Sequence, residues 1–111
     1  MKITAAIVIY NPRIDWLMKS IRSFTDKENF DKKLYLIDNS PAPNRELVKL
    51  SGEKIEYIFN NRNLGFGKAH NIGLKKAIAE NSEFHLILNP DVLFDSDILL
   101  ELASVLESDQ T

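Results

Sequence analysis

Short apolar runs rich in β-branched residues alternate along this chain with stretches of helical periodicity, and no other feature of the sequence constrains the fold as much. The runs are residues 3–10, 34–37, 55–59 and 84–88. Runs of this length suit buried strands better than helices. Because strands that alternate with helices form layered α/β folds, the pattern predicts a parallel sheet with helices packed on it.

Four amphipathic helices are expected between and after these strands. They cover residues 11–24, 44–50, 66–78 and 95–106. Asn11 is the predicted cap of the first helix, with Pro12 in its first turn. The apolar stripe expected on the third helix is Phe66, Ala69, Gly73, Leu74, Ala77 and Ile78. Right-handed crossovers then favour the strand order 3-2-1-4 in a Rossmann-like three-layer sandwich, formed by a single domain over residues 1–111.

Composition excludes several classes of protein. The chain has 111 residues, 44% of them hydrophobic and 27% charged, which excludes intrinsic disorder and allows a substantial core. A net charge of -2 leaves no basic excess for binding nucleic acid. Without cysteine there is no disulfide scaffold, thiolate zinc site or cysteine nucleophile. The apolar runs are too short for a transmembrane segment, and residues 3–10 lack a signal-peptide cleavage pattern, so we expect a cytoplasmic protein, free or peripheral to a membrane.

Each predicted strand ends in polar residues. They are Tyr10 and Asn11, Asp38 and Asn39, Asn60 and Asn61, and Asn89 with Asp91. Asparagine and aspartate also form turns, but four such ends together favour a ligand site, because ligands bind at the carboxyl edge of an open α/β sheet. We expect Tyr10 at the floor of this crevice, Asp38 on one side, and Asn89 with Asp91 on the other. Carboxylate and carboxamide groups there can hold Mg²⁺ or Mn²⁺, which suits a nucleoside diphosphate.

Several common phosphate and nucleophile motifs are absent. No G-x-G-x-x-G sequence follows the first strand, which argues against a dinucleotide fold. Gly67 and Lys68 hint at a Walker loop, but Arg62 and Ala69 stand where that loop needs glycine and serine or threonine. No acidic cluster ends the first strand, as a receiver domain requires, and no serine lies in a G-x-S-x-G elbow. A flavodoxin-like or receiver domain stays open as an alternative.

Four ordered blocks of sequence carry a resemblance to a known family. They are VIYNP (residues 8–12), LIDNS (36–40), NLGFGKAHNIG (63–73) and LNPDV (88–92). In this order they resemble the family 2 glycosyltransferases of the GT-A fold, and most of all their rhamnosyltransferase-like branch. The resemblance covers nearly the whole chain and implies the N-terminal, donor-nucleotide-binding half of such an enzyme. The acceptor half, with the Asp or Glu that serves as catalytic base, is expected to be absent from these residues.

The resemblance also implies roles for individual residues. The nucleotide-binding residues would be Tyr10, Asn11, Pro12, Asp38, Asn63, Gly65, His70 and Asn89, and Asp91 would bind the divalent metal. Tyr10 and Asp38 would contact the pyrimidine base and its ribose. Two positions depart from the family pattern: Asn89 replaces the first acid of the D-x-D element, and His70 stands where arginine is frequent and would donate to phosphate only when protonated. The alternatives are a core aromatic for Tyr10, a turn cap for Asp38 and a packing residue for His70.

By this resemblance the parent enzyme transfers a sugar, such as rhamnose, from a dTDP- or UDP-sugar to a cell-surface polysaccharide or lipid-linked glycan. The isolated chain is expected to be inactive, because no residue in it maps to the catalytic base. The alternative is a catalytically inactive nucleotide-binding or structural α/β module. Strand 84–88 carries no lysine, proline or interior charge, so its open edge, together with the stripe of Ile98, Leu102 and Leu106, predicts a homo-oligomer.

Overall fold

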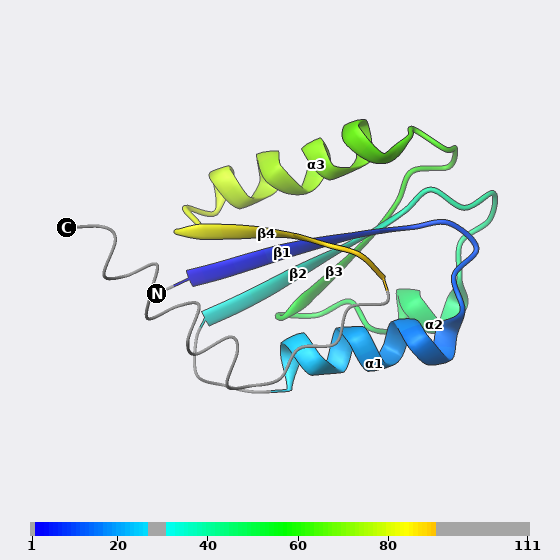
Figure 1. Cartoon of the computed structure of the whole chain (residues 1–111), viewed down its shortest axis with the longest axis horizontal. Helices are drawn as coiled ribbons and strands as arrows, with labels where there is room; N and C mark the ends of the chain where they lie inside the picture. Colours follow the sequence, from blue (N-terminus) through cyan, green and yellow to red (C-terminus); the bar gives the residue numbers. More distant parts are fainter. Residues whose placement is uncertain (1, 27–30, 91–111) are drawn as a thin grey trace.

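The chain forms a parallel sheet between two layers of helices (Figure 1). The computed structural model describes residues 2–26 and 31–90. In chain order the elements are β1 (Lys2–Ile9), α1 (Ile14–Thr25), β2 (Asp31–Asp38), α2 (Arg45–Val48), β3 (Ile55–Phe59), α3 (Phe66–Ala79) and β4 (Phe84–Leu88). Within the described residues the sheet has four strands in the order β3-β2-β1-β4, all parallel, which confirms the predicted fold class and strand order.

β1 is the buried centre of the sheet, as its apolar run predicts. Every residue from Ile3 to Ile7 is buried between the two helical layers. The strand ends at Ile9, so Tyr10 falls in the loop after it. β2 begins at Asp31, before its apolar run, because the stem of Lys32 is buried and its ammonium group donates to the Phe24 carbonyl at 3.0 Å.

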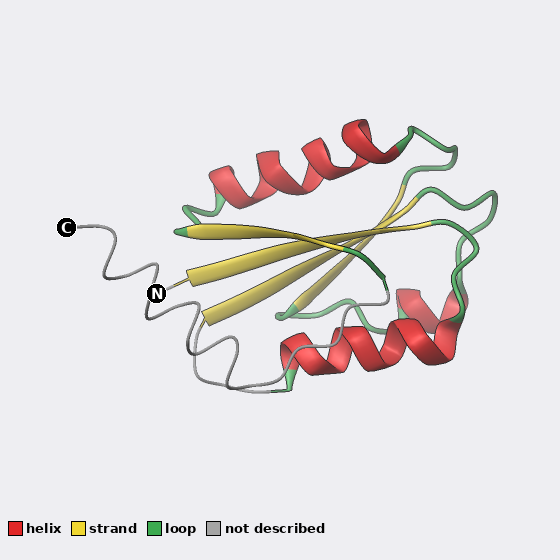
Figure 2. Cartoon of the chain, in the orientation of Figure 1, coloured by secondary structure: helices red, strands yellow, loops and turns green. Residues whose placement is uncertain are grey.

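α1 and α2 pack on one face of the sheet, and α3 packs on the other (Figure 2). The core under α1 and α2 consists of Ile3, Ala5, Ile7, Ile9, Leu17, Ile21, Phe24, Leu34, Leu36, Leu47 and Leu88. The core under α3 consists of Ala6, Tyr35, Ile37, Ala69 and Ala77. Successive strand residues point to opposite faces, so each central strand contributes to both cores, which explains why these strands are apolar throughout.

The first helix begins later than the sequence predicts. Its N-cap is Arg13, which makes no capping hydrogen bond from its side chain. Asn11 does not cap the helix: its φ is 42°, in the left-handed region that asparagine tolerates better than most residues. In this conformation the Asn11 N–H donates to Ser40 Oγ at 2.7 Å. The chain therefore turns toward the end of β2 before α1 starts.

The short helix predicted from Asn44 is present as α2, although it ends at Val48. Asn44 is its N-cap, and Asn44 Oδ1 accepts from the N–H groups of Glu46 and Leu47 at 2.9 and 3.2 Å. These bonds satisfy amides that the helix itself leaves without partners. The cap fixes the segment just before α2, which lies beside the end of β2.

The buried face of α3 is narrower than the predicted stripe. The residues that face the sheet are Ala69, His70, Gly73 and Ala77. Three members of the predicted stripe are exposed instead, namely Phe66, Leu74 and Ile78. The cause is a close approach at Gly73, where an added Cβ atom would lie 2.8 Å from the Cβ of Ala6. Small side chains fit between helix and strand at this distance, so the larger ones lie at the flanks.

Two predictions concern residues outside the described part of the chain. They are the metal-binding role of Asp91 and the helix over residues 95–106. None of the helices in the described part is long and apolar enough to cross a membrane.

Candidate functional site

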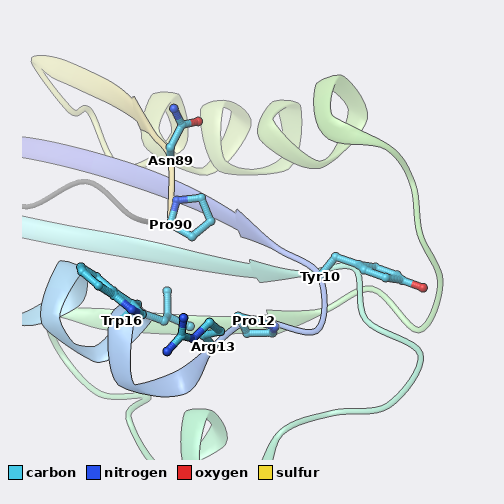
Figure 3. Close-up of a pocket in the computed structure, with 7 residues that line it drawn as sticks. Tyr10, Pro12, Arg13, Trp16, Asn89 and Pro90 are labelled. Carbon is cyan, nitrogen blue, oxygen red and sulfur yellow. The ribbon is translucent and has the colours of Figure 1, made fainter.

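Two cavities lie where the polar residues after β1, β2 and β4 come together. A cavity of about 690 Å³ is lined by Tyr10, Pro12, Arg13, Trp16, Leu17, Asn89 and Pro90 (Figure 3). A smaller cavity of about 260 Å³ is lined by Asn11, Pro12, Asp38, Ser40, Ala42, Pro43 and Asn44. Pro12 lines both, so the two cavities adjoin at the loop after β1. Asn60 and Asn61, at the end of β3, line neither of them.

The larger cavity lies between the start of α1 and the segment after β4. Ser20 of α1 donates from its Oγ to the Pro90 carbonyl at 2.7 Å, which holds this segment against the helix. Tyr10 extends away from its loop with 55% of its surface exposed, so it forms the rim of the cavity and not the expected floor (Figure 3). An exposed aromatic ring at a cavity mouth offers a face on which a planar base can stack.

Asp38 lies at the floor of the smaller cavity, where only 1% of its surface is exposed. It is the last residue of β2, so strand pairing fixes its backbone. Its Oδ1 accepts from the Ser40 N–H at 2.9 Å, and its Oδ2 accepts from the Tyr57 hydroxyl at 2.5 Å. The bond to Ser40 is the turn-capping contact given above as the alternative role of Asp38. Asp38 therefore caps the turn and faces the cavity at once.

Tyr57 stands behind Asp38 on β3 and is a site residue that the sequence pattern does not predict. Its hydroxyl donates to Asp38 and accepts from the Asn44 N–H at 3.2 Å. Burial, and after it the hydrogen bond to Asp38, raises the pKa of Tyr57 to about 12. The phenol therefore keeps its proton at neutral pH. Tyr57 pairs with Leu36 in the sheet, so it lies diagonal to Asp38 on the same face. The sequence of either strand alone does not determine this register.

Asn39 ties the loops around the site together. It is buried, and its Oδ1 accepts from Asn60 Nδ2 at 2.7 Å and from the Leu64 N–H at 3.5 Å. Its Nδ2 donates to the Gly65 carbonyl at 3.3 Å. Gly65 has a φ of 82°, and its N–H donates to Asn63 Oδ1 at 2.9 Å. Asn63 and Gly65 therefore shape the loop before α3, and neither lines one of the two cavities.

His70 lies on the buried face of α3 and lines neither cavity. It is 4% exposed, and its ring packs edge-on against Phe66 with ring centroids 4.4 Å apart. Neither ring nitrogen has a hydrogen-bond partner in the described part of the chain. Burial lowers the pKa of His70 from its ordinary value of 6.5, so the ring is neutral at pH 7. His70 thus occupies the packing position given above as the alternative to a phosphate contact.

A divalent cation at this edge would depend on the segment after β4. Over residues 2–26 and 31–90, no three acidic or histidine side chains cluster so as to enclose a metal ion. Asn89 offers an exposed carboxamide oxygen beside the larger cavity, which is a ligand that Mg²⁺ and Mn²⁺ accept. Such ions keep several water and phosphate oxygens, so one or two protein ligands are enough to hold them, and Asn89 is one candidate within the described residues.

A parallel α/β sheet with adjoining cavities at its carboxyl edge defines the class of Rossmann-like, ligand-binding domains. The family described as Glycosyl transferase family 2 matches residues 4–111. The chain therefore belongs to glycosyl transferase family 2, which confirms the family resemblance of the four sequence blocks.

Solved structures share this fold. The chain is similar to TarS of S. aureus, with a TM-score of 0.77 and 21% identity over 97% of this chain and 20% of that one. It is also similar to the structure of S. aureus TarS 1-349, with a TM-score of 0.78 and 21% identity over 97% of this chain and 33% of that one. The chain thus spans between a fifth and a third of these two proteins. No curated protein sequence matches it.

Proposed function

We propose that this chain binds the nucleoside diphosphate of a sugar donor and that the protein containing it is a glycosyltransferase. One observation carries the proposal: a cavity with the Asp38 carboxylate at its floor lies at the carboxyl edge of the sheet in a member of glycosyl transferase family 2. A buried carboxylate that accepts hydrogen bonds suits the polar edge of a base, and the adjoining cavity leaves room for the ribose and the diphosphate.

The smaller cavity receives the pyrimidine base in this proposal. Asp38 accepts a hydrogen bond from the base edge, and the segment of Asn11 and Pro12 forms another wall. Tyr10, on the rim of the adjoining cavity, contacts the base or its ribose through the face of its ring. The ribose and the diphosphate then extend past Pro12 into the larger cavity.

The diphosphate approaches Asn89, and Asp91 holds a divalent cation, Mg²⁺ or Mn²⁺, beside it. When bound, such a cation neutralises charge on the diphosphate leaving group. Asn63 and Gly65 shape the loop that flanks the nucleotide. His70 contributes to this site only indirectly: its buried ring packs α3 against the sheet, and α3 follows the loop that flanks the nucleotide.

The proposed donor is a dTDP- or UDP-sugar, such as dTDP-rhamnose, and the proposed acceptor is a cell-surface polysaccharide or a lipid-linked glycan. The acceptor site and the catalytic base belong to a part of the enzyme outside these 111 residues, so the chain alone binds nucleotide without turnover. The enzyme works in the cytoplasm, free or peripheral to a membrane. The rhamnosyltransferase-like branch rests on the four sequence blocks alone.

Calorimetric titration with UDP and dTDP, with and without Mn²⁺, tests nucleotide binding directly. We expect binding of at least one nucleotide, tighter when Mn²⁺ is present, with GDP as the control that does not bind. No heat with any nucleotide would leave the alternative, a structural α/β module. Transfer or hydrolysis from radiolabelled nucleotide sugars by the full-length protein tests the activity, and a full-length protein that consumes none of them would overturn it.

The two carboxylates have separable roles, and this separation is the first prediction. Asp91→Ala should abolish the part of UDP binding that depends on Mn²⁺ and leave uridine binding unchanged. Asp38→Ala should weaken uridine and UDP alike, because it removes the acceptor for the base. Calorimetry of both variants with uridine and UDP decides the matter. Equal losses that do not depend on Mn²⁺ would show that the assigned roles are wrong.

A further inference from the structure

We propose that Tyr57 is a positioning residue that fixes the Asp38 carboxylate and thereby makes the smaller cavity select uracil or thymine over cytosine. The inference rests on the nucleotide site of the proposed function and adds a selectivity determinant to it. Tyr57 does not line the cavity; it acts from behind the cavity wall through its hydroxyl group.

The Tyr57 hydroxyl joins two walls of the cavity. It donates to Asp38 Oδ2 at 2.5 Å and accepts from the Asn44 N–H at 3.2 Å. Asp38 and Asn44 both line the cavity, one at the end of β2 and the other at the start of α2. Because one oxygen atom bonds to both, the spacing of these two walls depends on the phenol. Asn44 is itself held in place by the cap that it forms on α2.

A third wall is tied to the same carboxylate through Ser40. The Ser40 N–H donates to Asp38 Oδ1 at 2.9 Å, and Ser40 Oγ accepts from the Asn11 N–H at 2.7 Å. Each carboxylate oxygen of Asp38 thus has one fixed donor inside the protein. Two bonds on opposite oxygens hold the plane of the carboxylate, and the remaining acceptor positions have a defined direction.

A fixed carboxylate distinguishes the pyrimidine bases by their hydrogen-bonding edges. Uracil and thymine carry an N3–H donor between two carbonyl groups, whereas cytosine presents an acceptor at N3 beside its amino group. An ionised carboxylate accepts only, so it pairs with the N3–H of uracil or thymine and opposes the N3 lone pair of cytosine. Cytosine could use its amino group only if the carboxylate or the base shifted sideways. The Tyr57 bond opposes the shift of the carboxylate.

Calorimetric titration of UDP, dTDP and CDP into the wild-type chain and Tyr57→Phe tests the inference. The wild type should prefer UDP to CDP. In Tyr57→Phe we expect UDP affinity to fall about tenfold and the ratio of UDP to CDP affinity to shrink by a similar factor, because one charge-assisted hydrogen bond is lost. A merely structural role would lower both affinities together and leave the ratio unchanged.

Tyr35→Phe is the matched control. Tyr35 is fully buried on the other face of the sheet, and its hydroxyl donates to Glu80 Oε2 at 2.8 Å. This variant also removes one hydroxyl from a tyrosine–carboxylate pair, but it touches neither cavity. We expect both affinities and their ratio to stay at wild-type values in Tyr35→Phe, measured at a temperature where circular dichroism shows both variants folded.

The outcomes separate the two proposals. A wild-type chain that binds none of the nucleotides overturns the proposed function and the role of Tyr57 with it. A wild-type chain that prefers UDP, with the same preference in Tyr57→Phe, overturns the role of Tyr57 alone. If Tyr57→Phe does not fold, 3-fluorotyrosine placed at position 57 keeps the shape and makes the hydroxyl a stronger donor. That substitution should raise the preference for UDP, and an unchanged preference would overturn the role of Tyr57.

Discussion

Three successive polar side chains at the end of β2 are buried, and each has a different hydrogen-bonding partner. Asp38 accepts from Tyr57 and Ser40, Asn39 binds the loop before α3, and Ser40 accepts from the Asn11 N–H. A buried polar group without a partner costs about 1 to 3 kcal/mol, so such a cluster persists only where its bonds are made. At the scale of the residue, the site is therefore built of side chains that hold one another and the loops around them.

His70 and His85 are the opposite case, because both ring nitrogens of His70 and the Nε2 of His85 lack hydrogen-bond partners in the described part of the chain. Burial lowers the pKa of each, and His70 lowers that of His85 further. Thr4 Oγ1 lies 2.7 Å from Nδ1 of His85, and the ring centroids of Tyr35 and His85 are 6.4 Å apart, so both of these neighbours are uncharged groups. The folded chain therefore favours the neutral form of both rings.

Acidification should destabilise the chain through these two histidines. Their pKa values are lower in the folded chain than the ordinary 6.5, so the unfolded chain binds more protons once the pH falls below that value. Stability is thus fully present above pH 6.5 and is lost as the pH falls toward the folded-state pKa values. We expect the Tm to drop by several degrees between pH 7.5 and 5.5, measured by circular dichroism.

His70→Leu should reduce this drop, because a leucine cannot bind the proton that favours unfolding. Lys75→Leu, which replaces an exposed residue on the same helix, is the control and should leave the pH dependence unchanged. A Tm that falls equally in the wild type and in His70→Leu would contradict the assignment to His70.

At the scale of the element, α3 shows that close packing, and not apolar periodicity alone, decides which residues of a helix face the sheet. Its buried face consists of small side chains and His70, although a periodic reading of the sequence also places Leu74 and Ile78 there. Gly73 allows the helix to approach Ala6 of β1 and Ile37 of β2. The helix therefore turns its smallest residues to the sheet, and its larger apolar residues lie on the flank.

Gly73→Ala should destabilise the chain even though alanine favours helices. The new Cβ would lie 2.8 Å from Ala6 Cβ and 3.3 Å from Ile37 Cδ1. Overpacking of this kind costs about 1 to 3 kcal/mol, which outweighs the gain of about 1 kcal/mol in helix propensity. Urea denaturation should therefore show a net loss of about 1 kcal/mol.

Gly67→Ala is the matched control on the same helix. A Cβ at Gly67 meets no atom within 4 Å, so this change should keep or raise the free energy of unfolding. If the two alanine variants were equally stable, close packing at Gly73 would not be the reason for the glycine.

At the scale of the whole molecule, β4 is one of the two edge strands of the sheet that the described residues form, and β3 is the other. Among the described strands β4 pairs with β1 alone (Figure 1). Ile87 on this strand is 61% exposed and Ile78 of α3 is 67% exposed. An unpaired, apolar strand edge readily recruits a further strand. The homo-oligomer expected from the sequence stays a prediction: β4 is the part of its proposed interface that the structure describes, and Ile98, Leu102 and Leu106 lie outside the described residues.

The chain of residues 1–111 should therefore self-associate through β4. Ile87→Lys places a charge on the edge strand and should shift the chain toward the monomer. Val48→Lys, which changes an exposed apolar residue on α2, should leave the association unchanged. Sedimentation velocity over a dilution series measures the masses. If the wild-type chain is a monomer at every concentration, this prediction is wrong.

Much of the fold can be predicted from the sequence because the strands and helices are marked by local patterns. The apolar runs 55–59 and 84–88 match β3 and β4, and Asn44 caps α2 as its residue type favours. The parallel sheet and its order come from alternation and from the handedness of crossovers. Asp38 is a candidate site residue for a similarly local reason, since it is an acid at the end of an apolar run.

The tertiary structure decided what depends on distance between elements. Register placed Tyr57 diagonal to Asp38, and the contact between Asn11 and Ser40 delayed the start of α1. The close approach at Gly73 decided which side of α3 faces the sheet. Because His70 is on that side, its ring is buried. The sequence by itself determined the elements, their order and the edge where the site lies, because these depend on neighbours along the chain. The partners of each site residue were decided only by the packed sheet, because they come from segments that are distant in sequence.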